Sequence, residues 1–269
     1  MSVLAKSVLT LTLCILGALL PVQVMAEAQK IGIVIMHGKG GSPSKHVAEL
    51  ASALEGKGYL VANLEMPWSG KRDYDATVSA AEEQVKTALS SLRSKGAQKV
   101  FVAGHSQGGA FALHLAGTHA VDGIICIAPG GNVASKVFHE KLGDSVALAK
   151  RLVTEGKGNE KIKLEDFEGK KGTYSVVTTP AVYLNWFDPD GAMNTKRAAR
   201  VANPQVPILW IVAKRDYPGL RSSNIPLFAS LPKNPYTRMY EPNSDHLGAP
   251  SASLDEIVRW TSEVAGAGR

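Results

Sequence analysis

The chain has 269 residues, of which 45% are hydrophobic and 20% are charged, and its formal net charge at pH 7 is +6. This length and composition suit one large α/β domain with a substantial core, and they exclude a disordered, collagen-like or multi-span membrane protein. The lysines and arginines are scattered among acidic residues without interleaved aromatic residues, so we expect no nucleic-acid partner.

Residues 1–26 have the pattern of a cleaved secretory signal. Lys6 precedes the apolar run from Val8 to Leu20, and Val24-Met25-Ala26 forms a cleavage site of the expected kind. A membrane anchor is the alternative, because the stretch approaches the length of a span, but its threonines, glycine and proline weaken that interpretation. We therefore expect an exported protein, periplasmic or secreted, whose mature chain is residues 27–269 and has no stable membrane span.

From residue 30 onward, short apolar runs alternate with segments of helical periodicity. The pattern predicts strands over 30–38, 59–67, 99–104 and 121–129, separated by helices over 42–58, 73–96 and 107–117. Strands that are buried on both faces and separated by helices imply a parallel sheet covered on both sides.

The alternation stops after the fourth of these strands. The segment up to residue 206 is too long for a plain connection in a compact domain, so we expect an insertion over about 131–206, with helical character. Strands are predicted again over 206–216 and 236–242, followed by a loop over 243–250 and a closing helix over 251–266.

The sequence Gly104-His105-Ser106-Gln107-Gly108 matches G-x-S-x-G between a predicted strand and a predicted helix. In this context the motif indicates a nucleophile elbow, a sharp turn that exposes the serine side chain. Glycines two residues to either side remove the Cβ atoms that would collide with neighbouring backbone. We therefore predict that Ser106 is a nucleophile.

A serine hydroxyl needs a base to take its proton and a third group to orient that base. After an elbow the expected chain order is serine, acid, histidine. His114 and His119 lie on or just after the helix behind the elbow, and His139 lies in the insertion. His246 lies in the loop after the last strand, where loops gather at the carboxyl edge of a parallel sheet, so we predict that it is the base.

Asp216 is the predicted acid because it directly follows the strand over 206–216 and would lie at the same sheet edge. Asp245 is adjacent to His246, but neighbouring side chains in an extended loop diverge. Asp188 and Asp190 belong to the sequence FDPDG, for which simple turn chemistry is a sufficient explanation.

A glycine-rich loop follows the first strand, with the sequence His37-Gly38-Lys39-Gly40-Gly41. Such a loop can supply a backbone N–H to an oxyanion hole, together with the N–H of the residue after the nucleophile. We predict Gln107 as one donor and Lys39 as the other, with Gly40 as the second choice. We expect His37 to support this loop by hydrogen bonding.

With these motifs, the chain from Lys30 to Ala265 resembles the α/β-hydrolase superfamily, in the branch with HG after an early strand and GHSxGG at the elbow. The resemblance implies an α/β-hydrolase fold with a mostly parallel central sheet, helices on both faces and a helical cap at the insertion. It also implies the roles of Ser106, Asp216 and His246 given above.

The function expected from these residues is that of an exported serine hydrolase that cleaves a carboxylic ester or a related small acyl compound through an acyl-enzyme. An exopeptidase or amidase of the same fold and a catalytically silent binding protein remain alternatives. Tyr183, Trp186 and Phe187 of the insertion either pack the cap or line an acyl pocket. No His or Cys cluster has the spacing of metal ligands, so we expect no metal and no cofactor.

Overall fold

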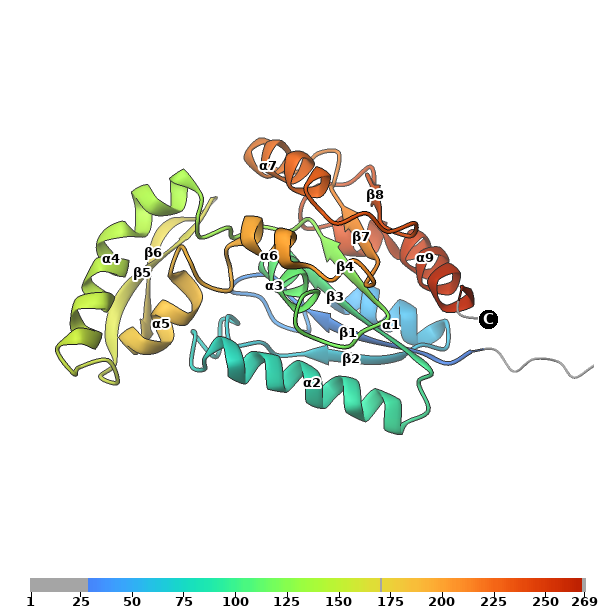
Figure 1. The fold of residues 1–269 in the computed structure, drawn as a ribbon, viewed down its shortest axis with the longest axis horizontal. Helices are drawn as coiled ribbons and strands as arrows, with labels where there is room; N and C mark the ends of the chain where they lie inside the picture. The colour runs from blue at the N-terminus through green and yellow to red at the C-terminus, as the bar shows by residue number, and fades with distance from the viewer. Residues whose placement is uncertain (1–28, 170, 268–269) are drawn as a thin grey trace, which may run out of the picture.

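The computed structural model describes residues 29–169 and 171–267, and the signal predicted over residues 1–26 lies outside these ranges. The centre of the fold is a six-stranded sheet in the order β2-β1-β3-β4-β7-β8 (Figure 1). Every neighbouring pair of its strands is parallel, which confirms the predicted sheet. The strands are β1 (Ile31–Met36), β2 (Leu60–Leu64), β3 (Lys99–His105), β4 (Gly123–Ile127), β7 (Ile208–Ile211) and β8 (Arg238–Tyr240).

Helices cover both faces of the sheet. Alternate residues along each strand face opposite sides, so the sheet contributes to two separate cores. One core joins the sheet to α2 (Val78–Ser94), α3 (Gln107–Leu115) and α6 (Thr195–Val201). The other joins it to α1 (Ala48–Gly56), α8 (Ala249–Ala252) and α9 (Leu254–Gly266). No helix within the described ranges has the length and apolarity needed to cross a bilayer.

The insertion between β4 and β7 is not purely helical, which corrects the prediction of a helical cap. It contains a two-stranded antiparallel sheet, β5 (Ile162–Glu168) and β6 (Gly172–Thr178), between α4 (Lys136–Thr154) and α5 (Pro180–Phe187). Figure 1 shows these four elements grouped beside the main sheet. We call this group, residues 136–187, the cap.

The cap is attached to the loop that follows β2. The backbone N–H of Val177 donates to Asp73, and the hydroxyl of Thr178 donates to the carbonyl of Tyr74. The indole N–H of Trp186 donates to the carbonyl of Ala76 at 2.7 Å. Three hydrogen bonds from different cap residues to one short loop fix the cap against the main domain.

The sequence did not predict α7 (Pro218–Ala229), which follows β7. Pro226 lies inside this helix and Gly219 lies in its first turn, and both residue types disfavour a helix interior. Asn224 is buried and donates from Nδ2 to the carbonyl of Pro129, just after β4. This bond holds α7 over the carboxyl end of β4.

Candidate active site

Ser106 lies at a strained turn between β3 and α3. Its φ is 54° and its ψ is −116°, a combination that non-glycine residues rarely adopt. Its N–H donates to the carbonyl of Ile127 at 2.9 Å, and its carbonyl accepts from Gly130 at 3.0 Å. The segment after the neighbouring strand β4 therefore holds this turn in place.

The glycines beside Ser106 are required by close backbone packing. A Cβ atom at Gly104 would lie 2.0 Å from the carbonyl oxygen of Gly108, and one at Gly108 would lie 2.7 Å from the carbonyl oxygens of Met36 and His37. Real Cβ atoms do not approach backbone so closely, so only glycine fits at both positions. The G-x-S-x-G spacing therefore has a direct structural cause.

The predicted acid and base are in contact. Nδ1 of His246 lies 2.9 Å from Oδ1 of Asp216, and both residues are buried. A carboxylate only accepts hydrogen bonds, so Nδ1 of His246 carries the hydrogen and its Nε2 is left with a lone pair. Asp216 also accepts the backbone N–H of Tyr217 at 2.7 Å. Ser106, Asp216 and His246 all follow the carboxyl ends of parallel strands, at one edge of the sheet.

The ring of His246 is held between two others. Its centroid lies 4.8 Å from that of His105 and 4.9 Å from that of Tyr217. Nε2 of His105 donates to the backbone carbonyl of His246 at 2.8 Å. Burial lowers the pKa of His105 to about 3, so this residue is neutral near pH 7. The sequence analysis did not assign a role to His105, which connects the elbow to the loop of the base.

The loop after β1 lies against Ser106. A Cβ atom at Gly38 would lie 3.2 Å from Cβ of Ser106, so little room is left for a side chain between this loop and the serine. The N–H of Gly40 donates to the carbonyl of Trp68 at 2.9 Å and is therefore occupied. Lys39 is the better candidate for the second oxyanion donor, as the sequence analysis ranked it. Gln107 occupies the first position of α3, where an N–H has no acceptor within the helix.

His37 supports this loop in the expected manner. Its Nε2 accepts the N–H of Met66 at 3.1 Å, and its carbonyl accepts the indole N–H of Trp68 at 2.9 Å. Burial lowers the pKa of His37, so the ring remains a neutral acceptor. These bonds join the loop after β1 to the loop after β2.

The three aromatic residues singled out in the cap are buried. Trp186 packs edge-on against Trp68 at 5.4 Å between ring centroids, and Tyr183 stacks on Phe187 at 4.3 Å. Each of the three is at most 3% exposed. For Trp186 and Tyr183 this placement favours the packing role. Phe187 also lines a hollow between α4 and α5.

That hollow has a volume of about 230 Å³ and lies within the cap and the segment leading to it. Two of its rings, Phe138 and Phe187, lie 5.2 and 5.5 Å from Nζ of Lys39, so it borders the glycine-rich loop. Its lining is mostly apolar and consists of Val133, Phe138, His139, Leu142, Gly143, Val146, Ala147, Lys150, Phe187 and Pro189.

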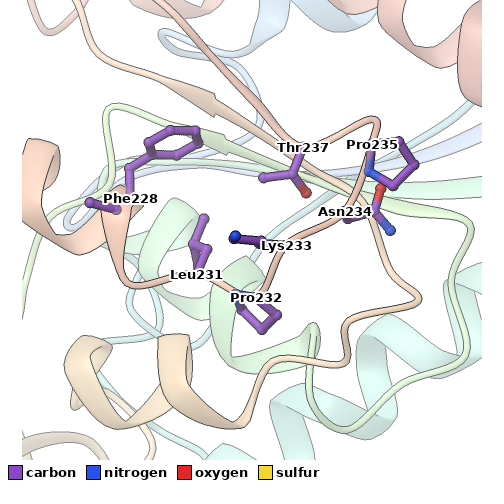
Figure 2. A pocket seen from close by; sticks show the side chains of 8 residues that line it. Phe228, Leu231, Pro232, Lys233, Asn234, Pro235 and Thr237 are labelled. Atoms are coloured by element: carbon purple, nitrogen blue, oxygen red, sulfur yellow. The ribbon is translucent and has the colours of Figure 1, made fainter.

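A larger hollow of about 510 Å³ lies elsewhere, between the end of α7 and the start of β8 (Figure 2). Thr237, which lines it, directly precedes β8. The amino ends of parallel strands lie at the edge opposite their carboxyl ends, so this hollow is remote from Ser106.

Leu220 of α7 is a site residue that the sequence analysis missed. A Cβ atom at Gly130 would lie 3.5 Å from Oγ of Ser106 and 3.4 Å from a methyl group of Leu220. Leu220 therefore contributes an apolar wall near the serine. No group of three or more His, Cys, Asp or Glu residues within 29–169 and 171–267 is arranged to hold a metal ion.

Residues 27–246 match the model of a protein family described as serine aminopeptidase, S33. No curated protein matches the sequence. Among solved structures, a monoacylglycerol lipase of Paleococcus ferrophilus is 20% identical with a TM-score of 0.61, over 87% of this chain and 94% of that one. A metagenome-derived lipolytic enzyme is 21% identical with a TM-score of 0.57, over 88% and 93%. An α/β hydrolase from Penicillium sp. sh18 is 12% identical with a TM-score of 0.65, over 88% and 90%.

Proposed function

Since the chain belongs to the serine aminopeptidase (S33) family of α/β hydrolases, it is a hydrolase, and we propose that it cleaves a carboxylic ester or a related acyl compound through an acyl-enzyme on Ser106. The observation that carries this proposal is the hydrogen bond between Asp216 and His246 at the sheet edge where the strained turn presents Ser106. A silent binding protein would need neither the strained turn nor the buried pair.

In the proposed reaction, Nε2 of His246 takes the proton of Ser106 as Oγ attacks the substrate carbonyl. Asp216 keeps the other ring nitrogen protonated and stabilises the imidazolium that forms. The main-chain N–H groups of Gln107 and Lys39 donate to the oxyanion. His246 then protonates the leaving alkoxide, which departs as an alcohol. Water, activated by the same histidine, hydrolyses the acyl-enzyme and regenerates Ser106.

The cap favours an ester substrate over a peptide with a free amino group. An aminopeptidase needs an uncompensated carboxylate for the substrate ammonium group. The buried carboxylate of the cap near the glycine-rich loop, Asp166, is already paired with Lys39 at 2.5 Å. The apolar hollow between α4 and α5 suits an acyl chain instead. The Paleococcus protein, named a monoacylglycerol lipase, has the same fold.

The test is a panel of p-nitrophenyl esters of increasing acyl length beside a panel of aminoacyl anilides. We expect hydrolysis of esters and, with a fluorophosphonate, a single adduct at Ser106 by mass spectrometry. The Ser106→Ala variant should lose both ester hydrolysis and fluorophosphonate labelling while keeping the wild-type melting temperature. Faster cleavage of anilides than of esters would favour the exopeptidase, and an unlabelled, inactive wild type would favour the binding protein.

We further propose that the protein is exported with cleavage after Ala26. The support is the sequence pattern of Lys6, the apolar run and Val24-Met25-Ala26. N-terminal sequencing of the protein from the extracytoplasmic fraction should begin near Glu27. An N-terminus that still carries Met1 in that fraction would contradict cleavage.

A further inference from the structure

A buried carboxylate of the cap lies at the centre of a polar cluster beside the glycine-rich loop. Asp166 on β5 is fully buried. Its Oδ1 lies 2.5 Å from Nζ of Lys39, and its Oδ2 accepts the hydroxyls of Tyr74 and Tyr174 at 3.0 and 2.9 Å. A charge this deep in a protein persists only when it is paired and hydrogen-bonded. Several partners therefore share the compensation of this carboxylate.

The contact between Asp166 and Lys39 anchors the glycine-rich loop. Lys39 carries the only side chain between Gly38 and Gly41, so it is the only side chain that can anchor this segment. Its ammonium group also donates to the carbonyl of Phe167 at 3.1 Å. The main-chain N–H of Lys39, the candidate oxyanion donor, is thus attached to the cap through its own side chain.

A second series of contacts leads from Asp166 through Tyr74 to Gln107, the other candidate oxyanion donor. The hydroxyl of Tyr74 lies 3.1 Å from the side-chain oxygen of Gln107 as well as 3.0 Å from Asp166. Burial and the charge of Asp166 raise the pKa of Tyr74 well above its usual value, so its hydroxyl stays protonated. The single hydroxyl hydrogen goes to the carboxylate, which is the stronger acceptor. A half-turn of the Gln107 amide group then lets its N–H donate to the hydroxyl oxygen.

We propose that Asp166 is a positioning residue for the oxyanion hole. Through Lys39 on one side and through Tyr74 and Gln107 on the other, it sets the orientation of two main-chain N–H groups that come from separate loops. The cap then forms part of the catalytic structure in addition to covering the site. This inference rests on the proposed function, because it concerns the transition state of the same reaction.

The two tyrosines provide a matched pair of variants. Tyr74→Phe and Tyr174→Phe each remove one hydroxyl from the same oxygen of Asp166, at nearly the same distance. Only Tyr74 continues to Gln107. We expect Tyr74→Phe to lower kcat by about 10- to 100-fold, since a small misplacement of catalytic groups has effects of that size, and to leave KM within about threefold. Tyr174→Phe should keep kcat within about threefold.

A second comparison separates positioning from charge compensation. Asp166→Asn leaves the ammonium group of Lys39 buried without its partner, and we expect a lower melting temperature and a lower kcat. The double variant Lys39→Met/Asp166→Asn removes both charges with unbranched or isosteric side chains of similar size. It should recover most of the melting temperature, since neutral replacements of buried ion pairs are often tolerated. Its kcat should stay at least about tenfold below the wild type.

The affinity for a boronic acid, which mimics the tetrahedral intermediate, supplies an independent measurement. It should fall in Tyr74→Phe by about the same factor as kcat/KM, because both quantities report how tightly the enzyme binds the tetrahedral species. Equal kcat values for the two tyrosine variants, or full recovery of kcat in the double variant, would overturn the inference. A wild type without ester hydrolysis or Ser106 labelling would instead overturn the proposed function.

Discussion

Arg215 and Asp245 pair as an isolated parallel β-bridge beyond the ends of β7 and β8. The N–H of Arg215 donates to the carbonyl of Ser244 at 2.9 Å. The residue that follows each bridge partner is a member of the candidate triad, Asp216 on one side and His246 on the other. The bridge resumes the pairing of the two segments with a register shifted by one residue from that of β7 and β8, and it brings the candidate acid beside the candidate base. It also explains why His246 pairs with Asp216 and not with its neighbour Asp245, since successive side chains of an extended segment point to opposite sides.

The first prediction tests this assignment of the acid. Asp216→Asn should fold normally but lower kcat by a factor on the order of 10⁴, because the amide favours the wrong tautomer of His246. Asp245→Asn is the matched control. The side-chain oxygen of Asp245 accepts the N–H of Gly248 at 2.8 Å, and an asparagine oxygen can accept the same bond. Ester hydrolysis and circular dichroism on both variants check the prediction, and a severe loss only in Asp245→Asn would contradict it.

The second prediction concerns the elbow. Gly104→Ala would place a Cβ atom 2.0 Å from a backbone oxygen, which cannot move without disrupting α3. We expect a loss of about 3 kcal/mol or more, equivalent to a decrease in Tm of about 6–12 °C, and loss of fluorophosphonate labelling. The control is Gly56→Ala on α1, whose Cβ would meet nothing within 4 Å. Thermal unfolding should show no decrease for the control. A Gly104→Ala protein with wild-type Tm would refute the steric explanation.

The third prediction follows from the depressed pKa of His105. The unfolded chain protonates this histidine below about pH 6.5, whereas the folded protein keeps it neutral to about pH 3. The folded state therefore loses stability as the pH falls between these values. His105→Gln retains a side-chain donor for the carbonyl of His246 but does not titrate. Between pH 7.5 and 4.5, urea unfolding should show the wild type losing about 2 to 3 kcal/mol more than this variant. Parallel losses would show that His105 does not remain neutral.

The fourth prediction concerns the hollow in the cap. Val146 lines it from α4, so Val146→Phe should fill part of it and shift the preference toward shorter acyl esters. A pocket change of this size corresponds to about 1–3 kcal/mol in kcat/KM between short and long chains. Val137→Phe lies on the same helix at a position that is 45% exposed and should leave the preference unchanged. Identical chain-length profiles for both variants would place the acyl site elsewhere.

The strands of the main sheet were predictable because they are buried on both faces and separated by periodic helices. The strands β5 and β6 were not predictable from the sequence, although buried and less buried residues alternate along β5 as in an ordinary strand. Leu164 and Asp166 are both fully or almost fully buried, so a carboxylate stands where the pattern requires an apolar residue. Its partner, Lys39, belongs to a loop far away in the sequence, and no local sequence pattern indicates an ion pair between two such residues.

The elbow and the residues of the candidate triad could be proposed from the sequence, because backbone sterics and the chemistry of an activated serine restrict the residue types. The contributions of α7 and of the β-bridge could not be predicted from the sequence. Leu220 belongs to a helix interrupted by Pro226, which hides the helical period. The bridge between Arg215 and Asp245 forms only when two strands from separate parts of the chain are already paired.

The adjacency of β4 and β7 in the sheet has a consequence for the order of folding. These strands are neighbours, with Ile124 paired to Ile208, yet the whole insertion lies between them in the chain. Their pairing must close a long loop, and the entropic cost of closure falls when the intervening segment has already become compact. The local hairpin of β5 and β6 can form first and shorten that search. During synthesis, the segment with Ser106 leaves the ribosome early, whereas the proposed acid and base, Asp216 and His246, follow only with β7 and β8. A growing chain would therefore hold the proposed nucleophile without the pair that activates it until both of these strands have emerged.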